Sequence, residues 1–146
     1  MSRLATRHAD ASDSPGLLLW RVTNDWQAAQ RAALKPYGLT HVQFVLLASL
    51  TWLADGPVTQ KELAAHAATD PMMTSQVVRA LAERGLVRRE PHPEDGRAVA
   101  LEVTEEGVAL ANQTVVVVEE CDRRFFSRLP EPTRFATDLR TLSTRT

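Results

Sequence analysis

The sequence predicts a mainly helical α+β domain with one small β-hairpin. Three observations predict this fold class: apolar residues recur at three- and four-residue steps along most of the chain, capping residues precede these segments, and one region alternates like strands around a turn. The chain has 146 residues, of which 44% are hydrophobic and 24% are charged. This length and balance are typical of a single soluble domain that buries a core.

Helix-capping residues divide most of the chain into helices. Residues 1–14 are small and polar and are expected to form a flexible tail, after which Ser14 and Pro15 open a helix that Pro36 ends. An N-capping residue precedes each of the next predicted helices: Thr40, Thr59, Asp70 and Thr104. These helices are expected to end near Ala54, Ala67, Arg84 and Arg128, and a last helix follows Pro130.

A β-hairpin is expected between residues 86 and 103. Segments 86–90 and 98–103 have strand character, and Asp95-Gly96 between them is the strongest turn signal. The β-branched run 115–118 would suit a strand by itself, but its flanks are helical and lack a turn signal, so a helix is retained. Two helices joined by a short turn and followed by a hairpin form a winged helix-turn-helix core, here flanked by further helices.

The composition argues against several other classes of protein. Cys121 is the single cysteine, so neither an intrachain disulfide nor a thiolate metal cluster is expected, and a small buried hydrophobic residue is favoured over a redox sensor. Glu62 and His66 supply only two ligands, so no metal or other cofactor is expected. The histidines lie in no catalytic signature, which disfavours an enzyme. Because neither a signal peptide nor a long apolar run is present, no membrane contact and a cytoplasmic location are expected.

The helix over residues 70–84 has a polar face suited to DNA bases. Its inward apolar stripe is expected to comprise Met73, Val77, Ala80, Leu81 and Arg84. The opposite face is expected to carry Met72, Ser75, Gln76 and Arg79, with Thr74 beside it. Hydroxyl, amide and guanidinium groups recognise base edges, and an exposed Met72 suits a thymine methyl better than it suits an ordinary solvated face. The net charge of −1 leaves room for such a local site.

The predicted hairpin adds a second candidate contact with DNA. Arg88 and Arg89 lie at its base, and Asp95 and Arg97 lie at its tip. An arginine on a projecting turn can enter a narrow minor groove, and Asp95 is expected to fix the tip by an Asx-type turn or by pairing with Arg97. A solvated arginine on an ordinary turn is the alternative. The backbone amide of Gln60, at the start of an earlier helix, is expected to lie near a phosphate.

Residues 58–104 resemble the winged helix-turn-helix of the multiple-antibiotic-resistance regulator (MarR) family. The resemblance is carried by the run LAERGLV at residues 81–87, by Arg89, by the wing pattern Asp95-x-Arg97 and by Leu101-x-Val103-Thr104, and the flanking helices extend it over nearly all of the chain after residue 14. It implies a homodimer whose first, fifth and sixth helices interlock, with recognition helices in successive major grooves of a pseudo-palindrome and wings in the minor grooves. It also implies a transcriptional regulator, more often a repressor, from which a small-molecule ligand often releases the DNA.

The flanking helices point to the dimer independently. Residues 15–36 and 105–146 carry apolar surface that the core, residues 40–104, cannot cover, so they are the expected dimerisation helices of a single domain spanning 15–146. The resemblance places an effector pocket between them and the core, near Trp20, Asn24, His41 and Phe44. Packing at a hinge or in the core is the favoured alternative for these four side chains.

One other function is weighed for the whole chain. A winged helix can serve as a protein-interaction module that has lost DNA binding, and an apolar outer face on the helix over residues 70–84 would favour that function. The polar outer face and Arg97 argue against it.

Overall fold

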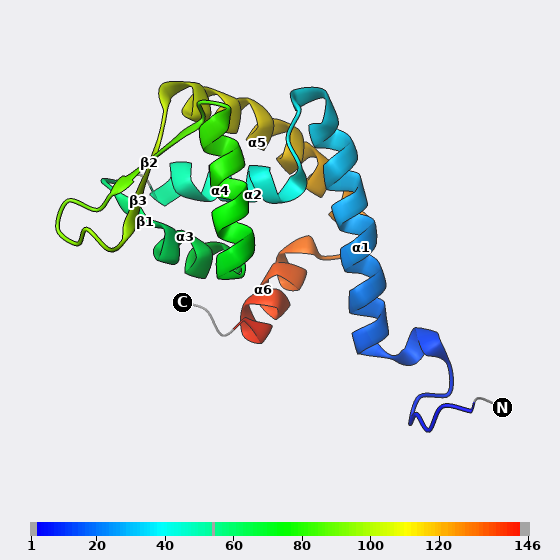
Figure 1. The fold of residues 1–146 in the computed structure, drawn as a ribbon. Coiled ribbons are helices and arrows are strands. Elements are labelled where there is room, and N and C mark those ends of the chain that lie inside the picture. The colour runs from blue at the N-terminus through cyan, green and yellow to red at the C-terminus, as the bar shows by residue number, and fades with distance from the viewer. Residues whose placement is uncertain (1–2, 54, 144–146) are drawn as a thin grey trace.

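The computed structural model describes residues 3–53 and 55–143 and confirms the mainly helical fold class (Figure 1). The α-helices are α1 (Pro15–Leu34), α2 (His41–Leu53), α3 (Gln60–Ala67), α4 (Pro71–Glu83), α5 (Glu105–Phe126) and α6 (Pro132–Leu142). The strands are β1 (Val58–Thr59), β2 (Val87–Pro91) and β3 (Val99–Val103), and two short 3-10 helices are η1 (Ala11–Asp13) and η2 (Lys35–Tyr37). η1 lies inside the segment that was expected to form a flexible tail. The predicted helix end at Ala54 lies outside the described residues.

The predicted capping residues begin the helices. Thr40 and Gln43 form both bonds of a capping box: the Thr40 amide donates to Gln43 Oε1 at 3.0 Å, and the Gln43 amide donates to Thr40 Oγ1 at 3.1 Å. Three further caps each accept a bond from the amide three residues on: Thr59, Asp70 and Thr104. These local bonds satisfy amides that a helix leaves without partners in its first turn.

The end of α4 is built by a Schellman motif. Gly85 takes a left-handed φ of +74°, and the amides of Gly85 and Leu86 donate to the carbonyls of Ala82 and Leu81. Gly107 of α5 packs against this turn so closely that a methyl group in its place would overlap the Leu86 carbonyl. The end of α4, the start of the wing and the start of α5 are therefore held together.

The sheet contains a strand that the sequence did not predict. Both predicted strands form an antiparallel hairpin, in which Arg88 faces Glu102 and Arg89 faces Leu101. In addition β1 pairs antiparallel with β3, with Val58 opposite Leu101, so that the strand order is β1-β3-β2. The expectation of a two-stranded hairpin was therefore incomplete. A two-residue strand is too short to show alternation, and its pairing joins segments far apart in the sequence.

The hydrophobic core surrounds α2. This helix packs against α1, α3, α4, α5 and β3, and its Leu46, Leu47 and Leu50 are buried. Apolar side chains from the surrounding elements complete the cluster, among them Leu63, Val78, Leu81, Leu101 and Val118. The elements that carry the candidate DNA contacts, α3, α4 and the wing, are thus mounted on one rigid helix.

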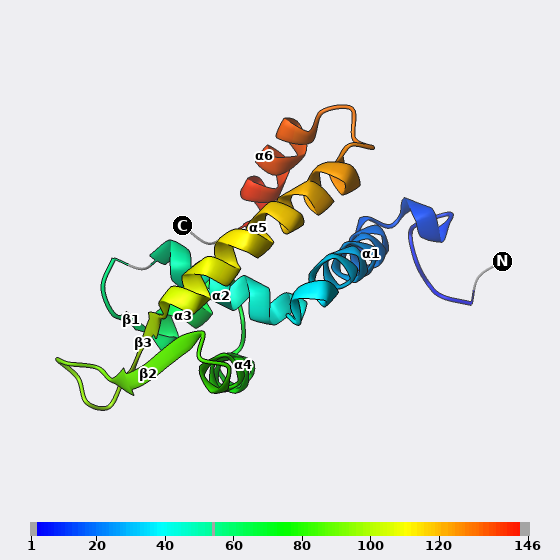
Figure 2. The same ribbon diagram turned by 90° about the horizontal axis from the view of Figure 1, so that it is seen from above.

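The outer helices bury much less. Figure 2 shows α1 and α6 projecting from the compact part of the molecule, on the sides away from the wing. No residue of α6 is buried, and α1 buries only Gln30 and Leu34. The run 115–118 is helical, as predicted, and lies inside α5. Among the described residues, no helix has the length and apolar character needed to cross a membrane.

Candidate nucleic-acid interface

The exposed face of α4 carries three of the predicted base-contacting side chains. Met72 is 73% exposed, and Gln76 and Arg79, on the following turns of the same face, are also exposed. Ser75 lies at the edge of this face and is half-buried. An apolar, an amide and a guanidinium group are therefore presented together, without a neighbouring element over them.

The inward stripe of α4 is displaced from the predicted one. Thr74, Val78 and Leu81 are its buried residues, whereas Met73 is exposed. Thr74 is completely buried, its hydroxyl donates to the Asp70 carbonyl at 2.8 Å, and the Thr69 hydroxyl lies 2.7 Å from it. The expectation that Thr74 lies beside the exposed face of α4 was therefore wrong. A threonine side chain can bury its methyl group once its hydroxyl bonds to the preceding turn, and a hydrophobicity pattern does not register this.

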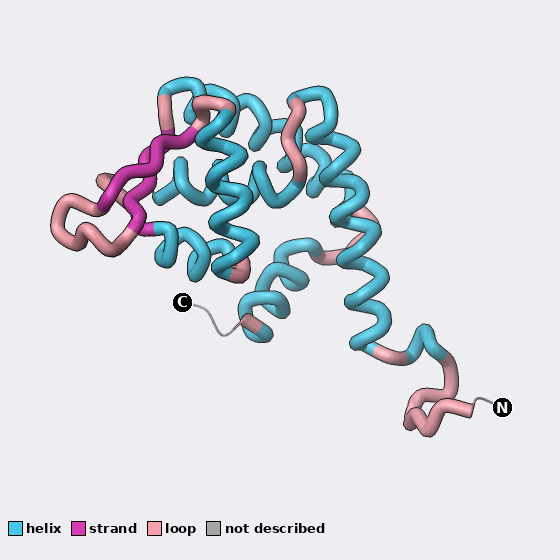
Figure 3. Tube along the Cα trace, in the orientation of Figure 1, coloured by secondary structure: helices cyan, strands magenta, loops and turns pink. Residues whose placement is uncertain are grey.

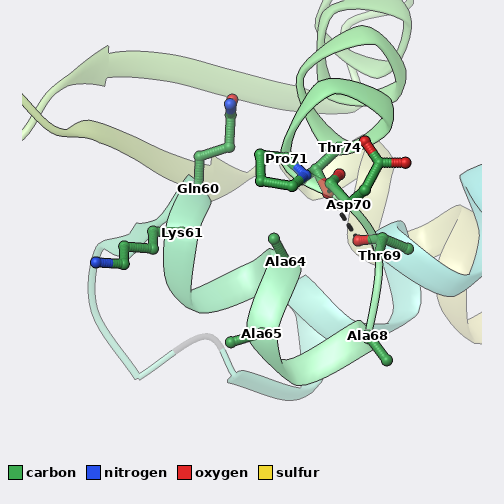
Figure 4. A pocket seen from close by; sticks show the side chains of 9 residues that line it. All are labelled: Gln60, Lys61, Ala64, Ala65, Ala68, Thr69, Asp70, Pro71 and Thr74. Atoms are coloured by element: carbon green, nitrogen blue, oxygen red, sulfur yellow. Dashed lines mark hydrogen bonds between the residues drawn. The ribbon is translucent and has the colours of Figure 1, made fainter.

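A concavity of about 680 Å³ separates α3 from the start of α4 (Figure 4). Its lining residues are mostly small and come from both helices: Gln60, Lys61, Ala64, Ala65, Ala68, Thr69, Asp70, Pro71 and Thr74. Gln60 and Lys61 form the wall at the first turn of α3, where their side chains point in different directions, and Pro71 at the start of α4 lies beside Gln60. The small side chains leave room for a DNA backbone strand to approach the start of both helices.

Gln60 and Lys61 supply the polar groups of this wall. Gln60 is half-buried, and among the described residues its side-chain oxygen is buried without a hydrogen-bond partner. Lys61 is exposed and was missed at the level of sequence, although its position beside Gln60 in the first turn of a helix was a signal for it. A lysine at this place suits a phosphate, and a phosphate contact fixes position without reading sequence.

The wing has an ordered tip. The amide of Arg97 donates to Asp95 Oδ1 at 3.1 Å, and the amide of Ala98 donates to the Asp95 carbonyl at 3.0 Å. Of the two predicted ways to fix the tip, the Asx-type turn is the one that the structure has. The loop of residues 92–98 extends away from the body of the protein (Figure 3), and Arg97 on it is exposed.

The arginines at the base of the wing differ in their surroundings. Arg88 forms an exposed ion pair with Glu102 across the strands, with 3.4 Å between Nη2 and Oε2. Such a pair contributes at most about 1 kcal/mol, but it competes with a phosphate for the guanidinium. Arg89 instead lines a shallow hollow of about 250 Å³ together with Arg97. Arg89 is therefore the better placed of the two for contact with an anion.

Helix α4 and the wing lie side by side. In Figure 2, α4 is seen end-on beside the β2–β3 hairpin, and α6 lies on the opposite side of α5. Because the buried residues of α4 face the core around α2, its exposed face points away from that core, with the wing beside the helix. This arrangement of a helix for the major groove and a hairpin for the neighbouring groove suits double-stranded DNA.

The four predicted effector-binding residues are not gathered into one cluster. Trp20 is 69% exposed, and the Asn24 side chain donates to the Trp20 carbonyl at 2.6 Å on the same helix. His41 packs edge-on against Trp26, with 5.0 Å between ring centroids. Phe44 is buried in the core. For Phe44 the packing alternative is therefore the one observed.

A polar cluster between α1 and α5 was not predicted. The Asp122 carboxylate accepts bonds from Trp26 Nε1 at 2.8 Å and from Gln30 Nε2 at 2.6 Å, and Gln30 is completely buried. The oxygen of the same side-chain amide, Gln30 Oε1, is buried and has no hydrogen-bond partner within the described part of the chain. Burial lowers the pKa of the neighbouring His41, and the Asp122 carboxylate opposes this shift.

Relatives of known class match almost the whole chain. The family model described as "MarR family" matches residues 39–99. An uncharacterised HTH-type transcriptional regulator of Bacillus subtilis, YdcH, is 40% identical over 139 residues, which cover 94% of this chain and 95% of the relative. The HTH-type transcriptional repressor Rv2887 of Mycobacterium tuberculosis is 37% identical over 124 residues, covering 84% and 87% of the two chains.

Solved structures agree with this classification. CouR of Rhodococcus jostii RHA1, determined with bound p-coumaroyl-CoA, is 30% identical with a TM-score of 0.79 and covers 92% of each chain. A mutant MarR of E. coli complexed with operator DNA is 25% identical with a TM-score of 0.76, covering 87% of this chain and 89% of that one. The chain therefore belongs to the MarR family of DNA-binding transcriptional regulators.

Proposed function

We propose that this protein is a transcriptional repressor that binds a pseudo-palindromic operator in double-stranded DNA as a homodimer. The observation that carries the proposal is the exposed face of α4, with Met72, Gln76 and Arg79, on a helix that lies beside a projecting wing with an exposed Arg97. Because DNA is the proposed partner, the cytoplasm is the proposed place of action.

Base recognition is assigned to α4. Gln76 can form two hydrogen bonds with the major-groove edge of adenine, and Arg79 can do so with guanine. Met72, which is exposed near the start of the helix, suits contact with a thymine methyl or a sugar. Ser75 at the edge of the face can donate to a base or a phosphate. Sequence preference is therefore expected to depend on α4.

Contacts that position the protein are assigned to α3 and the wing. In the first turn of α3, the backbone amide of Gln60 and the side-chain ammonium of Lys61 are proposed to contact the phosphates of one DNA strand. Arg97 is proposed to enter a narrow minor groove, where the potential is most negative, while Asp95 shapes the turn that carries it. Arg88 and Arg89 at the base of the wing are proposed to contact phosphates. Arg88 must first break its ion pair with Glu102 to do so.

The homodimer is proposed from uncovered apolar side chains. They lie on the two outer helices: Leu18, Leu19, Trp20 and Val22 on α1, and Leu139 and Leu142 on α6. Two copies that bury these side chains against each other form a symmetric interface, and the symmetry of the dimer matches that of a palindromic site. The repressor named among the relatives supports the proposed sign of regulation.

A small-molecule effector is proposed as the means of release. The complex of CouR with p-coumaroyl-CoA supports this for the present chain. His41 packs against Trp26 where α1 meets α2, so a ligand bound there would differ in affinity between two orientations of the DNA-binding elements. Trp20 and Asn24 of α1 are proposed to complete such a site only when a ligand is bound.

Selection of bound DNA with the purified protein tests the proposed function. Genomic fragments retained by the protein should share a pseudo-palindrome whose half-sites lie roughly 10 bp apart. A reporter placed behind the selected site should be less active when the protein is present. If no sequence is enriched over fragments retained by bare resin, the protein is an interaction module without DNA binding. If transcription instead rises, the repressor assignment is wrong.

A further inference from the structure

A single side chain connects the end of the recognition helix to the junction between α1 and α2. Arg84 is the C-cap residue of α4, and its Nη1 donates to the carbonyl oxygen of Gly38 at 2.7 Å. Gly38 ends η2 and has a left-handed φ of +68°. The bond spans 46 positions of the sequence and lies on the surface of the protein.

Packing alone connects α4 to α1 only indirectly. α4 packs mainly against α2, α3 and β2, whereas α1 packs mainly against α5 and α2. The Arg84–Gly38 bond joins α4 directly to the segment in which α1 ends. This segment is held firmly, since Leu34 before it and Leu39 after it are both buried. The Gly38 carbonyl is therefore a fixed acceptor for the guanidinium.

The position of this bond gives it an effect on the DNA-binding end of α4. The helix has 13 residues and is roughly 20 Å long at 1.5 Å per residue. The Arg84 bond fixes the C-terminal end of α4, whereas Met72 and Gln76 lie nearer its N-terminal end. A small rotation about the Arg84 end therefore moves the base-contacting side chains of Met72 and Gln76 along the groove. In a dimer, the same rotation in both protomers changes the separation of the two recognition helices.

We propose that Arg84 is a positioning residue that sets the half-site spacing of the operator by tying α4 to the α1–α2 junction. The inference rests on the proposed function, because it requires a dimer that reads two half-sites. Arg84 contacts no base in this proposal; it acts through the orientation of α4. A guanidinium is suited to this role because a charge-assisted hydrogen bond to a carbonyl is stronger than a neutral one.

The test compares binding to operators whose half-sites are moved apart or together by one and two base pairs. Arg84→Ala should lower affinity about threefold to tenfold at the selected spacing, which is within the ordinary net value of a single hydrogen bond. It should lower affinity less at the altered spacings, so that the preference for one spacing becomes flatter. Arg84→Met, which keeps the side-chain stem but has no donor, should behave like Arg84→Ala.

A control separates the bond from the charge. Arg89→Ala removes one positive charge from the wing and should lower affinity by a similar factor at every spacing. If the Arg84 variants also shift all spacings equally, or if Arg84→Met keeps the parent's preference, Arg84 does not set the spacing. A parent protein that selects no operator would instead overturn the proposed function together with this inference. Thermal unfolding of each variant establishes that the compared proteins are folded.

Discussion

The winged helix-turn-helix core and the outer helices differ in how much of their apolar surface is buried. In the core, the leucines of α2, α3 and α4 are buried against one another. On α1 and α6, large apolar side chains such as Leu19 and Leu142 remain in contact with water. Exposed apolar groups gathered on helices that project from a core are typical of an interaction surface. One chain is therefore enough to complete the core, whereas the exposed side chains of the outer helices are the basis on which a second chain is proposed.

The largest expected effect comes from charging the outer helices. Leu19→Glu combined with Leu139→Glu should prevent two copies from associating, because each carboxylate would be buried in the interface. Light scattering at micromolar concentration should return twice the chain mass for the parent and the single mass for the variant. Loss of the second half-site should lower operator affinity by roughly 10²–10⁴.

Trp52→Glu is the matched control for this comparison. Trp52 is 86% exposed and lies at the end of α2, so the substitution also replaces an exposed apolar side chain by a carboxylate. It should leave the mass and the affinity unchanged. A double variant that still dimerises, or a parent that is a folded monomer, would contradict the assignment of α1 and α6.

In the core, Leu81→Ala should lower the free energy of unfolding by roughly 2–5 kcal/mol, because it leaves a cavity beneath α4. Met72→Ala on the opposite face of the same helix should change it by less than about 0.5 kcal/mol. Urea denaturation measures both values. An equal loss of unfolding free energy in the two variants would contradict the assignment of Leu81 to the buried face and of Met72 to the exposed face.

Arg97→Ala should weaken operator binding about tenfold or more, from the roughly 1–3 kcal/mol of a direct contact, and leave the fold intact. The loss should be greatest at operators with A·T-rich flanks, since their minor grooves are the narrowest. Arg7→Ala removes the same charge from the exposed segment before α1 and serves as the control in the binding titration. Equal binding by the Arg97 variant and the parent at matched salt would exclude the wing contact.

Arg79 and Lys61 are expected to differ in kind. Arg79→Ala should change the preferred base at one position of the selected operator, because Arg79 is assigned to a base edge. Lys61→Ala should weaken all sequences alike and reduce the salt dependence by about one ion, because Lys61 is assigned to a phosphate. Binding selections at two salt concentrations distinguish these outcomes. A uniform loss for Arg79→Ala would make Arg79 a phosphate contact.

The smallest expected effect concerns His41, at the border between the two regions. Burial holds the pKa of His41 below its ordinary value of 6.5 in the folded chain, so the unfolded chain takes up a proton first as the pH falls. The free energy of unfolding should therefore decrease as the pH falls below 6.5, until the folded histidine is protonated as well. His41→Phe keeps a ring beside Trp26 and should remove this dependence in urea titrations. An unchanged pH dependence would assign it to other groups.

The helix caps and tight turns could be predicted from the sequence, because each depends on residues that are close together along the chain. The caps at Thr40, Asp70 and Thr104 bond to amides only three positions away, and Gly85 supplies the left-handed residue that ends α4. The turn at Asp95 is equally local. For this reason the helices, the wing and three exposed side chains of α4, Met72, Gln76 and Arg79, could be predicted, although the fit of that face to DNA remains a prediction.

The contacts between distant segments could not be predicted from the sequence and are known only from the folded structure. Trp26 and Gln30 meet Asp122 across 96 and 92 positions, and Arg84 reaches Gly38 across 46. The inward turn of Thr74 depends on the packing of α4 against the core as well as on its local hydroxyl bond. Periodicity shows that a residue repeats on a face, but which polar side chains can enter the interior depends on partners supplied when the elements pack together.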